Sequence, residues 1–221
     1  MAGIPWRADT AADEAVIAAN VTTVMTRIVA AAPSRPNPAV SLAHGWHRAI
    51  YRGVSSVPGP KYLGEPRGGA DPDLGDYDVV LADHLGNVLA QGVPAARVQS
   101  ELASFEASLS TATARLDAVI PPQQKPTDGA QLLAVVELSA IVHGEWVRIH
   151  PYANGNGRVA RLWANWIATR YGLPPFVRIK PRPDGLLYIQ AAHRSMGTPP
   201  GFVGDHSLTI SLFLDLLRQR P

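Results

Sequence analysis

The chain has 221 residues, which fits one domain or one domain with a small appendage, and its 46% apolar content supports a packed core. It contains no cysteine, which excludes disulfides, thiolate metal sites and cysteine nucleophiles. The formal charge is only +2, but residues 146–221 contain ten Lys/Arg against three Asp/Glu. This basic part predicts a polyanionic ligand, either nucleic acid or nucleotide phosphate, with a solvated basic surface as the alternative.

No stretch approaches the roughly 20 apolar residues of a membrane span, and the first residues lack the apolar core of a secretory signal. We therefore expect a cytoplasmic protein with no membrane partner. Export by a signal-free route would leave no trace in the sequence.

Apolar residues at helical spacing, together with Gly and Pro at the ends of the segments, predict an all-α fold. In chain order, helices are expected over residues 9–31, 41–51, 95–118, 130–149, 157–171, 185–196 and 207–218. Asp128 is placed to cap the fourth helix and Gly172 to end the fifth. The segment 77–90 has the only strand signal and predicts one β-hairpin with its turn at 83–87. One hairpin cannot form a core, so it is expected to lie on the helices.

The loop between the fourth and fifth helices carries the chemistry. Its sequence is His-Pro-Tyr-Ala-Asn-Gly-Asn-Gly-Arg over residues 150–158, followed by Arg161. Glycines at a helix N-terminus let backbone N–H groups approach an anion, and arginines three residues apart share one helix face. Arginine pairs grip phosphate, and His150 can take a proton near neutral pH. This combination suits phosphoryl or nucleotidyl transfer, while the absence of a G-x-x-x-x-G-K-[ST] loop excludes an ordinary P-loop enzyme.

This loop resembles the motif of the Fic family, H-P-F-x-[D/E]-G-N-G-R-x-x-R, with Tyr152 in place of phenylalanine. The matching positions are His150, Pro151, Gly155, Asn156, Gly157, Arg158 and Arg161. The resemblance implies an all-α Fic core with a hairpin flap. On this basis residues 39–221 would form the Fic domain and residues 1–38 an N-terminal helix and linker.

The resemblance also implies a reaction, the transfer of AMP from ATP to a hydroxyl side chain of a target protein. His150 would deprotonate that hydroxyl, and the hairpin 77–90 would dock the target by strand addition. The phosphates would be held by Gly155, Asn156, Gly157, Arg158 and Arg161. Asn154 stands where the family usually has an acidic ligand for magnesium, so we expect weaker metal binding, a different donor or lower activity.

Many Fic proteins carry an inhibitory helix with the pattern [S/T]-x-x-x-E-[G/N], whose glutamate pairs with the second arginine of the motif. Of the six glutamates in this chain, only Glu14 follows a Ser or Thr by four residues, namely Thr10. Ala15 departs from the pattern. The resemblance therefore suggests Glu14 as an inhibitory residue, with an ordinary acid in the first turn of a helix as the alternative.

Other functions remain open from the sequence. A degenerate Fic domain could bind nucleotide without turnover, and the same fold could use another nucleotide donor or transfer phosphate as Doc does. A nucleic-acid-binding module is less favoured, because the sequence has no zinc-finger spacing or clear helix-turn-helix. The six histidines outside the loop, His143 among them, are expected to be structural or superficial. The basic run Arg178, Lys180 and Arg182 is expected to lie in a solvated loop, with phosphate or target contact as the second interpretation. The sequence also leaves open a homo-oligomer and a toxin with a separate antitoxin.

Overall fold

The computed structural model describes residue 6 and residues 10–82, 88–183 and 185–219. The helices in these ranges are α1 (Ala11–Ala31), α2 (Val40–Ile50), α3 (Ala95–Val119), α4 (Gly129–Ile149), α5 (Asn156–Arg170), α6 (Leu186–Met196) and α7 (Ser207–Arg218), with short 3-10 turns η1 (Ala32–Ser34) and η2 (Pro60–Tyr62). The predicted all-α fold is confirmed, and each predicted helix lies within two residues of an observed one. Asp128 caps α4 as predicted, since its carboxylate accepts a hydrogen bond from the Gln131 N–H.

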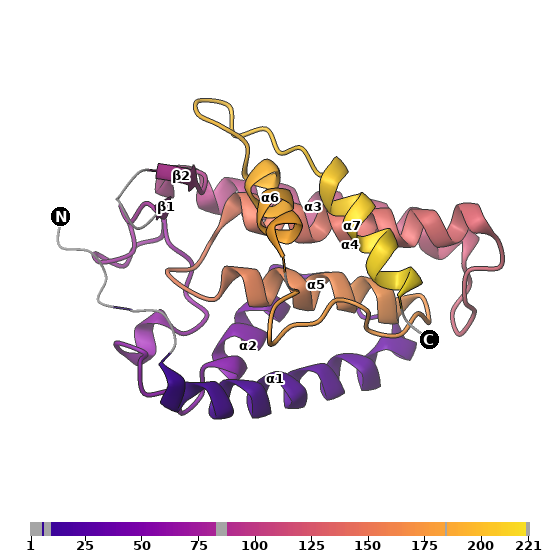
Figure 1. Cartoon of the computed structure of the whole chain (residues 1–221), viewed down its shortest axis with the longest axis horizontal. Helices are drawn as coiled ribbons and strands as arrows, with labels where there is room; N and C mark the ends of the chain where they lie inside the picture. The colour runs from indigo at the N-terminus through magenta and orange to yellow at the C-terminus, as the bar shows by residue number, and fades with distance from the viewer. Residues whose placement is uncertain (1–5, 7–9, 83–87, 184, 220–221) are drawn as a thin grey trace.

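The helices pack around α4 and α5 (Figure 1). In Figure 1, α1 runs along one side of α5, while α3 and α4 lie on the other side and α6 and α7 cross in front. Nearly every residue of α5 is buried, because neighbouring helices cover it on several sides. The loop between α4 and α5 is therefore held by two of the best-packed helices in the molecule.

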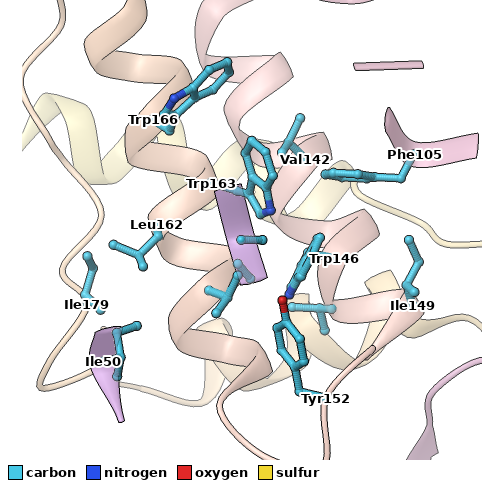
Figure 2. Packing of buried hydrophobic residues seen from close by; sticks show 14 of the residues in the cluster. Ile50, Phe105, Val142, Trp146, Ile149, Tyr152, Leu162, Trp163, Trp166 and Ile179 are labelled. Carbon is cyan, nitrogen blue, oxygen red and sulfur yellow. The ribbon is translucent and has the colours of Figure 1, made fainter. Parts of the chain in front are cut away.

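Aromatic side chains fill the core between α3, α4 and α5 (Figure 2). Trp146 of α4 and Trp163 of α5 are fully buried, with ring centroids 6.0 Å apart, and Phe105 of α3 packs edge-on against both. Trp166 lies one turn beyond Trp163 and is also buried. All three tryptophans therefore belong to the core. Edge-to-face aromatic packing of this kind contributes about 0.5–1.5 kcal/mol per pair beyond area burial.

Helix α1 packs on this core along one stripe, formed by Ile17, Val21, Val24 and Ile28. By length and composition alone, Ala11–Ser34 is apolar enough to cross a membrane, with a mean hydropathy of 1.6. This corrects the expectation that no segment approaches a membrane span. The helix is rich in alanine and contains threonine, so its length and mean hydropathy reach those of a span although its apolar run is interrupted. In the structure, the apolar stripe of α1 faces α2 and α5.

The predicted hairpin is present as strands β1 (Val80–Ala82) and β2 (Val88–Gln91), paired antiparallel with Val80 opposite Gln91. Its predicted turn, 83–87, lies outside the described residues. The hairpin lies at the end of the molecule where the α4–α5 loop turns (Figure 1). Val88 and Leu89 are more than half exposed, so this part of the hairpin has apolar side chains on the surface.

Candidate active site

His150 is the residue that ends α4. Its backbone has φ 52° and ψ 55°, in the left-handed region, and its N–H still donates to the Trp146 carbonyl. A residue other than glycine is uncommon in this region, and such positions concentrate at functional sites. The left-handed turn directs the chain out of α4 and presents the imidazole beside the loop.

The hydrogen bonding of His150 makes it suitable as a base. Nδ1 lies 3.0 Å from the Val147 carbonyl oxygen, which can only accept, so Nδ1 carries the proton and Nε2 the lone pair. Burial is the main cause that lowers the pKa of His150 to about 4; the nearby Arg67 guanidinium adds to this effect, and the hydrogen bond to Val147 opposes it. The imidazole is therefore neutral at pH 7 and ready to accept a proton.

The loop after His150 is closed by the Asn156 side chain. Asn156 Oδ1 accepts from the Tyr152 N–H at 2.9 Å, and Nδ2 donates to the Tyr152 carbonyl at 2.7 Å. Asn156 is 2% exposed, and both ends of its side-chain amide hold the loop in shape. In the predicted phosphate binding, the backbone N–H groups at the start of α5 would therefore act in place of this side chain. The hydroxyl by which Tyr152 differs from phenylalanine is 2.8 Å from His44 Nδ1.

Gly155 has a steric reason to be glycine. Its φ is +83°, and a Cβ atom there would lie 2.6 Å from the ring of Tyr51. The same Tyr51 hydroxyl accepts a hydrogen bond from Arg158 Nη1 at 2.6 Å. Tyr51 thus contacts the glycine turn and holds an arginine of the motif, a role that its place at the end of α2 does not reveal in the sequence. Burial lowers the pKa of Arg158 to about 10, which leaves it charged at neutral pH.

Arg161 is buried and held on two sides. Its Nε and Nη2 donate to the Ile179 carbonyl at 3.2 and 3.0 Å, and its Nη1 donates to the Tyr188 hydroxyl at 2.7 Å. Tyr188 is in turn 3.0 Å from His143 Nε2. Burial lowers the pKa of His143 to about 3, with a further contribution from the Arg161 charge. The predicted structural role of His143 is confirmed. His143 is linked to Arg161 through the Tyr188 hydroxyl, and Tyr188 was not among the predicted site residues.

Two cavities meet at Arg161 and Arg182, which line both. One, about 580 Å³, is lined by Glu14, Ala15, Ala18, Arg158, Arg161, Ile179, Lys180, Pro181 and Arg182. The other, about 180 Å³, includes His150, Gly157 and Tyr188 in its lining. The predicted base and both motif arginines are therefore brought together around adjoining spaces, and the basic run 178–182 contributes two further cations.

Arg67 connects the hairpin to the start of the loop between α4 and α5, and it was not among the predicted site residues. It is fully buried and donates to the carbonyls of His150 at 2.8 Å, Ile149 at 2.9 Å and Val93 at 2.5 Å. Its Nη1 lies 3.5 Å from the Asp78 carboxylate, just before β1. One guanidinium thus joins both ends of the hairpin segment to the end of α4. A single arginine inside a Gly/Pro-rich stretch has no sequence pattern that would reveal this.

The residues at the loop do not fit a protein-bound magnesium ion. The Asn154 side-chain oxygen accepts from the Gly155 N–H at 2.6 Å, and its backbone oxygen is 3.0 Å from His47 Nε2. Glu14 is the only acid lining the two cavities in the described part of the chain. Within the same ranges, no group of three or more His, Cys, Asp or Glu is arranged to hold a metal. Magnesium prefers anionic oxygen ligands, and this site offers no such set.

Glu14 lies at the rim of the larger cavity, at the start of α1. Its carboxylate pairs with Lys180 Nζ at 2.9 Å, whereas the donors of Arg161 described above go to Ile179 and Tyr188. Thr10 is the N-cap of α1 and accepts from the Asp13 N–H. Asp13 accepts from Ser55, which lowers the pKa of its carboxyl group and pins this end of α1 in place.

A third cavity, about 530 Å³, lies between α3 and α4. Its floor is apolar, and its polar end is occupied by Arg148, which pairs with Glu101 and Glu145 at 2.7 and 2.8 Å. It contains none of the predicted site residues. His150, Arg158 and Arg161 line the two cavities around Arg161 instead.

Comparisons with known proteins identify the family of the chain. The model of the Fic/DOC family matches residues 43–168, more than half of the chain. The protein adenylyltransferase Fic of Nematostella vectensis is 41% identical over 64 residues, which are 28% of this chain and 15% of that protein. A uridine 5'-monophosphate transferase of Xanthomonas campestris pv. campestris (strain 8004) is 44% identical over 43 residues, 20% of this chain and 8% of that protein. The chain thus spans only a small part of these relatives.

Two solved structures share the fold. A Fic domain-containing signaling protein from Bacteroides thetaiotaomicron VPI-5482 superposes with a TM-score of 0.60 at 20% identity, covering 96% of this chain and 72% of that one. The BepC protein of Bartonella tribocorum with bound AMPPNP gives a TM-score of 0.54 at 15% identity, covering 90% and 85%. Together with the motif geometry and the family match, these structures lead to one conclusion. The chain belongs to the Fic/DOC family and has the fold of a Fic-type transferase.

Proposed function

We propose that this chain transfers the AMP moiety of ATP to a hydroxyl side chain of a target protein. The observation that carries the proposal is that His150 and Arg161 line one cavity, and that Arg161 with Arg158 lines the adjoining one. A neutral base therefore lies next to a place for phosphate. Relatives named as adenylyltransferases support the same class of reaction.

The proposed step uses the residues as the geometry places them. The target hydroxyl oxygen attacks the α-phosphorus, and its proton passes to Nε2 of His150. The bond between the α-phosphorus and the bridging oxygen breaks, and pyrophosphate leaves. Arg158, Arg161 and the first-turn N–H groups of α5 stabilise the negative charge on the phosphates. The exposed apolar side chains of β2 would receive an extended target segment by strand addition.

A second donor deserves the same test, because one relative is named a uridine 5'-monophosphate transferase. The motif residues would contact the phosphates and not the base, so they are compatible with either nucleotide. The experiment incubates the protein, with and without a cell extract as acceptor, with each of four α-labelled nucleoside triphosphates. A parallel reaction with γ-labelled ATP detects phosphate transfer instead. Protein-bound label from α-ATP supports AMP transfer, and label only from α-UTP moves the proposal to UMP.

The control for this screen is His150→Asn, since asparagine tolerates the left-handed backbone of this position but is no base. Label that is equal in wild type and His150→Asn would overturn the role of His150. Absence of label from all five labelled nucleotides would favour a domain that binds nucleotide without turnover.

Self-inhibition by Glu14 belongs to the same proposal. The Glu14 carboxylate lies at the rim of the cavity that Arg158 and Arg161 line, where it would compete with phosphate for the cations. Glu14→Gly should therefore raise the amount of label on the protein itself. Unchanged labelling of the purified variant would remove this part of the proposal.

A further inference from the structure

The larger cavity has a marked excess of positive charge. Arg158, Arg161, Lys180 and Arg182 all line it, and Glu14 is the one acid among its lining residues in the described part of the chain. The loop that would hold a magnesium ion offers an amide, Asn154, whose oxygen is already bonded to the Gly155 N–H. The cavity therefore contains several cationic side chains, while the adjacent loop lacks the anionic ligands that would bind a metal ion.

Lys180 is oriented into this cavity. Its side chain is only 13% exposed, and its ammonium group reaches the Glu14 carboxylate across the space between residues 178–182 and α1. Glu14 itself is 60% exposed, so its carboxylate can return to water at little cost. The carboxylate thus marks a position where an anion binds Lys180, and a phosphate oxygen is the stronger ligand for it.

Arg182 complements Lys180. It lines the cavity with the motif arginines and also the one that contains His150. It is exposed, and in the part of the chain that the structure describes its guanidinium makes no ion pair with an acid. Arginine binds phosphate bidentately, so Arg182 is placed to contact a phosphate between the two cavities.

From this arrangement we infer that Lys180 and Arg182 supply to the triphosphate the positive charge that a divalent cation would otherwise supply. The chain then binds its nucleotide without a metal ion. This inference rests on the proposed function, since it names the groups that hold the donor's phosphates. A merely structural role for Lys180, holding α1 to residues 178–182 through Glu14, would instead affect stability and leave phosphate binding unchanged.

The test is isothermal titration calorimetry of the full chain with two probes, ATP and inorganic tripolyphosphate, each in excess EDTA and in magnesium chloride. The variants are Lys180→Ala, Arg182→Ala and the two combined. Arg218→Ala is the matched control, because it removes one positive charge from a side chain that is 75% exposed on α7 and lines none of the cavities described above. Glu14→Gln removes the carboxylate that competes for Lys180.

We expect both probes to bind in EDTA, with affinities within about threefold of those in magnesium. Each single variant should lose about tenfold or more, because a charged hydrogen bond to phosphate is lost. Arg218→Ala should bind as wild type does. Glu14→Gln should bind more tightly than wild type, and this gain should shrink when Lys180 is also alanine, as coupled residues require.

Three other results would overturn the inference. Binding only with magnesium would remove the metal-free site and leave the proposed transferase reaction standing. Binding in EDTA that the Lys180 and Arg182 variants do not weaken would show that other groups hold the phosphates. No binding of either probe in either condition would remove the proposed function and this inference with it.

Discussion

A Cβ atom at Gly92 would lie 2.7 Å from the Cβ atom of His150. Gly92 directly follows β2, and its N–H donates to the Val79 carbonyl, so it extends the hairpin ladder up to the proposed base. The same Cβ atom would lie 2.8 Å from Arg67 Nη2. The hairpin and the catalytic loop are thus in direct contact, and only a hydrogen fits between them.

Gly92→Ala should therefore displace His150 without straining the backbone, because Gly92 is not in the left-handed region. A displacement of about 1 Å at a catalytic group can lower the rate about 100-fold. We expect His150-dependent labelling to fall about 10- to 100-fold in a quantitative transfer assay. Gly129→Ala is the matched control, since a Cβ atom there has no neighbour within 4 Å. Equal rates for the two variants would show that this contact does not position His150.

Arg67→Ala should destabilise the fold. Its guanidinium is fully buried, and its loss would leave the carbonyls of Val93, Ile149 and His150 without this donor. We expect a loss of about 3 kcal/mol in the free energy of unfolding, measured by urea denaturation. Arg67→Lys should lose less of the free energy of unfolding than Arg67→Ala, because lysine keeps the charge but lacks the forked donors of the guanidinium. Arg27 is exposed, so Arg27→Ala serves as the control and should change the free energy of unfolding by less than about 0.5 kcal/mol.

The pH dependence of transfer reports on His150. The base must be neutral to act, and burial lowers its pKa to about 4, so it stays deprotonated as the pH falls through 6.5. We expect the rate not to fall to half its maximum near pH 6.5 and to decline only as the pH approaches about 4. The measurement is the initial rate between pH 5 and 8, with circular dichroism at each pH to verify folding. A rate that halves near pH 6.5 would mean that His150 titrates as in water.

Asn154→Asp should increase magnesium-dependent transfer. The substitution places an anionic oxygen at the loop, where it can ligate a metal shared with phosphate. We expect the rate of the variant to rise across a magnesium titration, compared with Asn154→Ser, which adds no charge. Equal or lower rates in Asn154→Asp at every magnesium concentration would contradict this.

The helices and the active-site motif were predictable from sequence because they depend on local patterns. Helix α4 begins at the Asp128 cap, and the left-handed His150 and Gly155 bracket a loop whose residues are adjacent in the chain. The apolar periodicity of α1, broken by prolines after Ala31, set its bounds in the same way.

The groups that support the motif were not predictable, because they reach it through tertiary contacts. Arg67 is 83 residues from His150 in the chain, and Tyr51 is 107 residues from Arg158. Tyr188 reaches Arg161 from α6. Lys180 was predicted as part of a solvated loop because the sequence gives no sign that Glu14, 166 residues away, packs against it.

The most direct test of the central claim compares the protein-bound label from α-labelled ATP in wild type and His150→Asn, at pH 7, with a cell extract as acceptor. The account predicts label in the wild-type reaction, on the chain or on extract proteins, and at least about a 100-fold loss in the variant, since general-base catalysis contributes about 10²–10⁴-fold. Label of equal amount in both reactions would show that His150 is not the base.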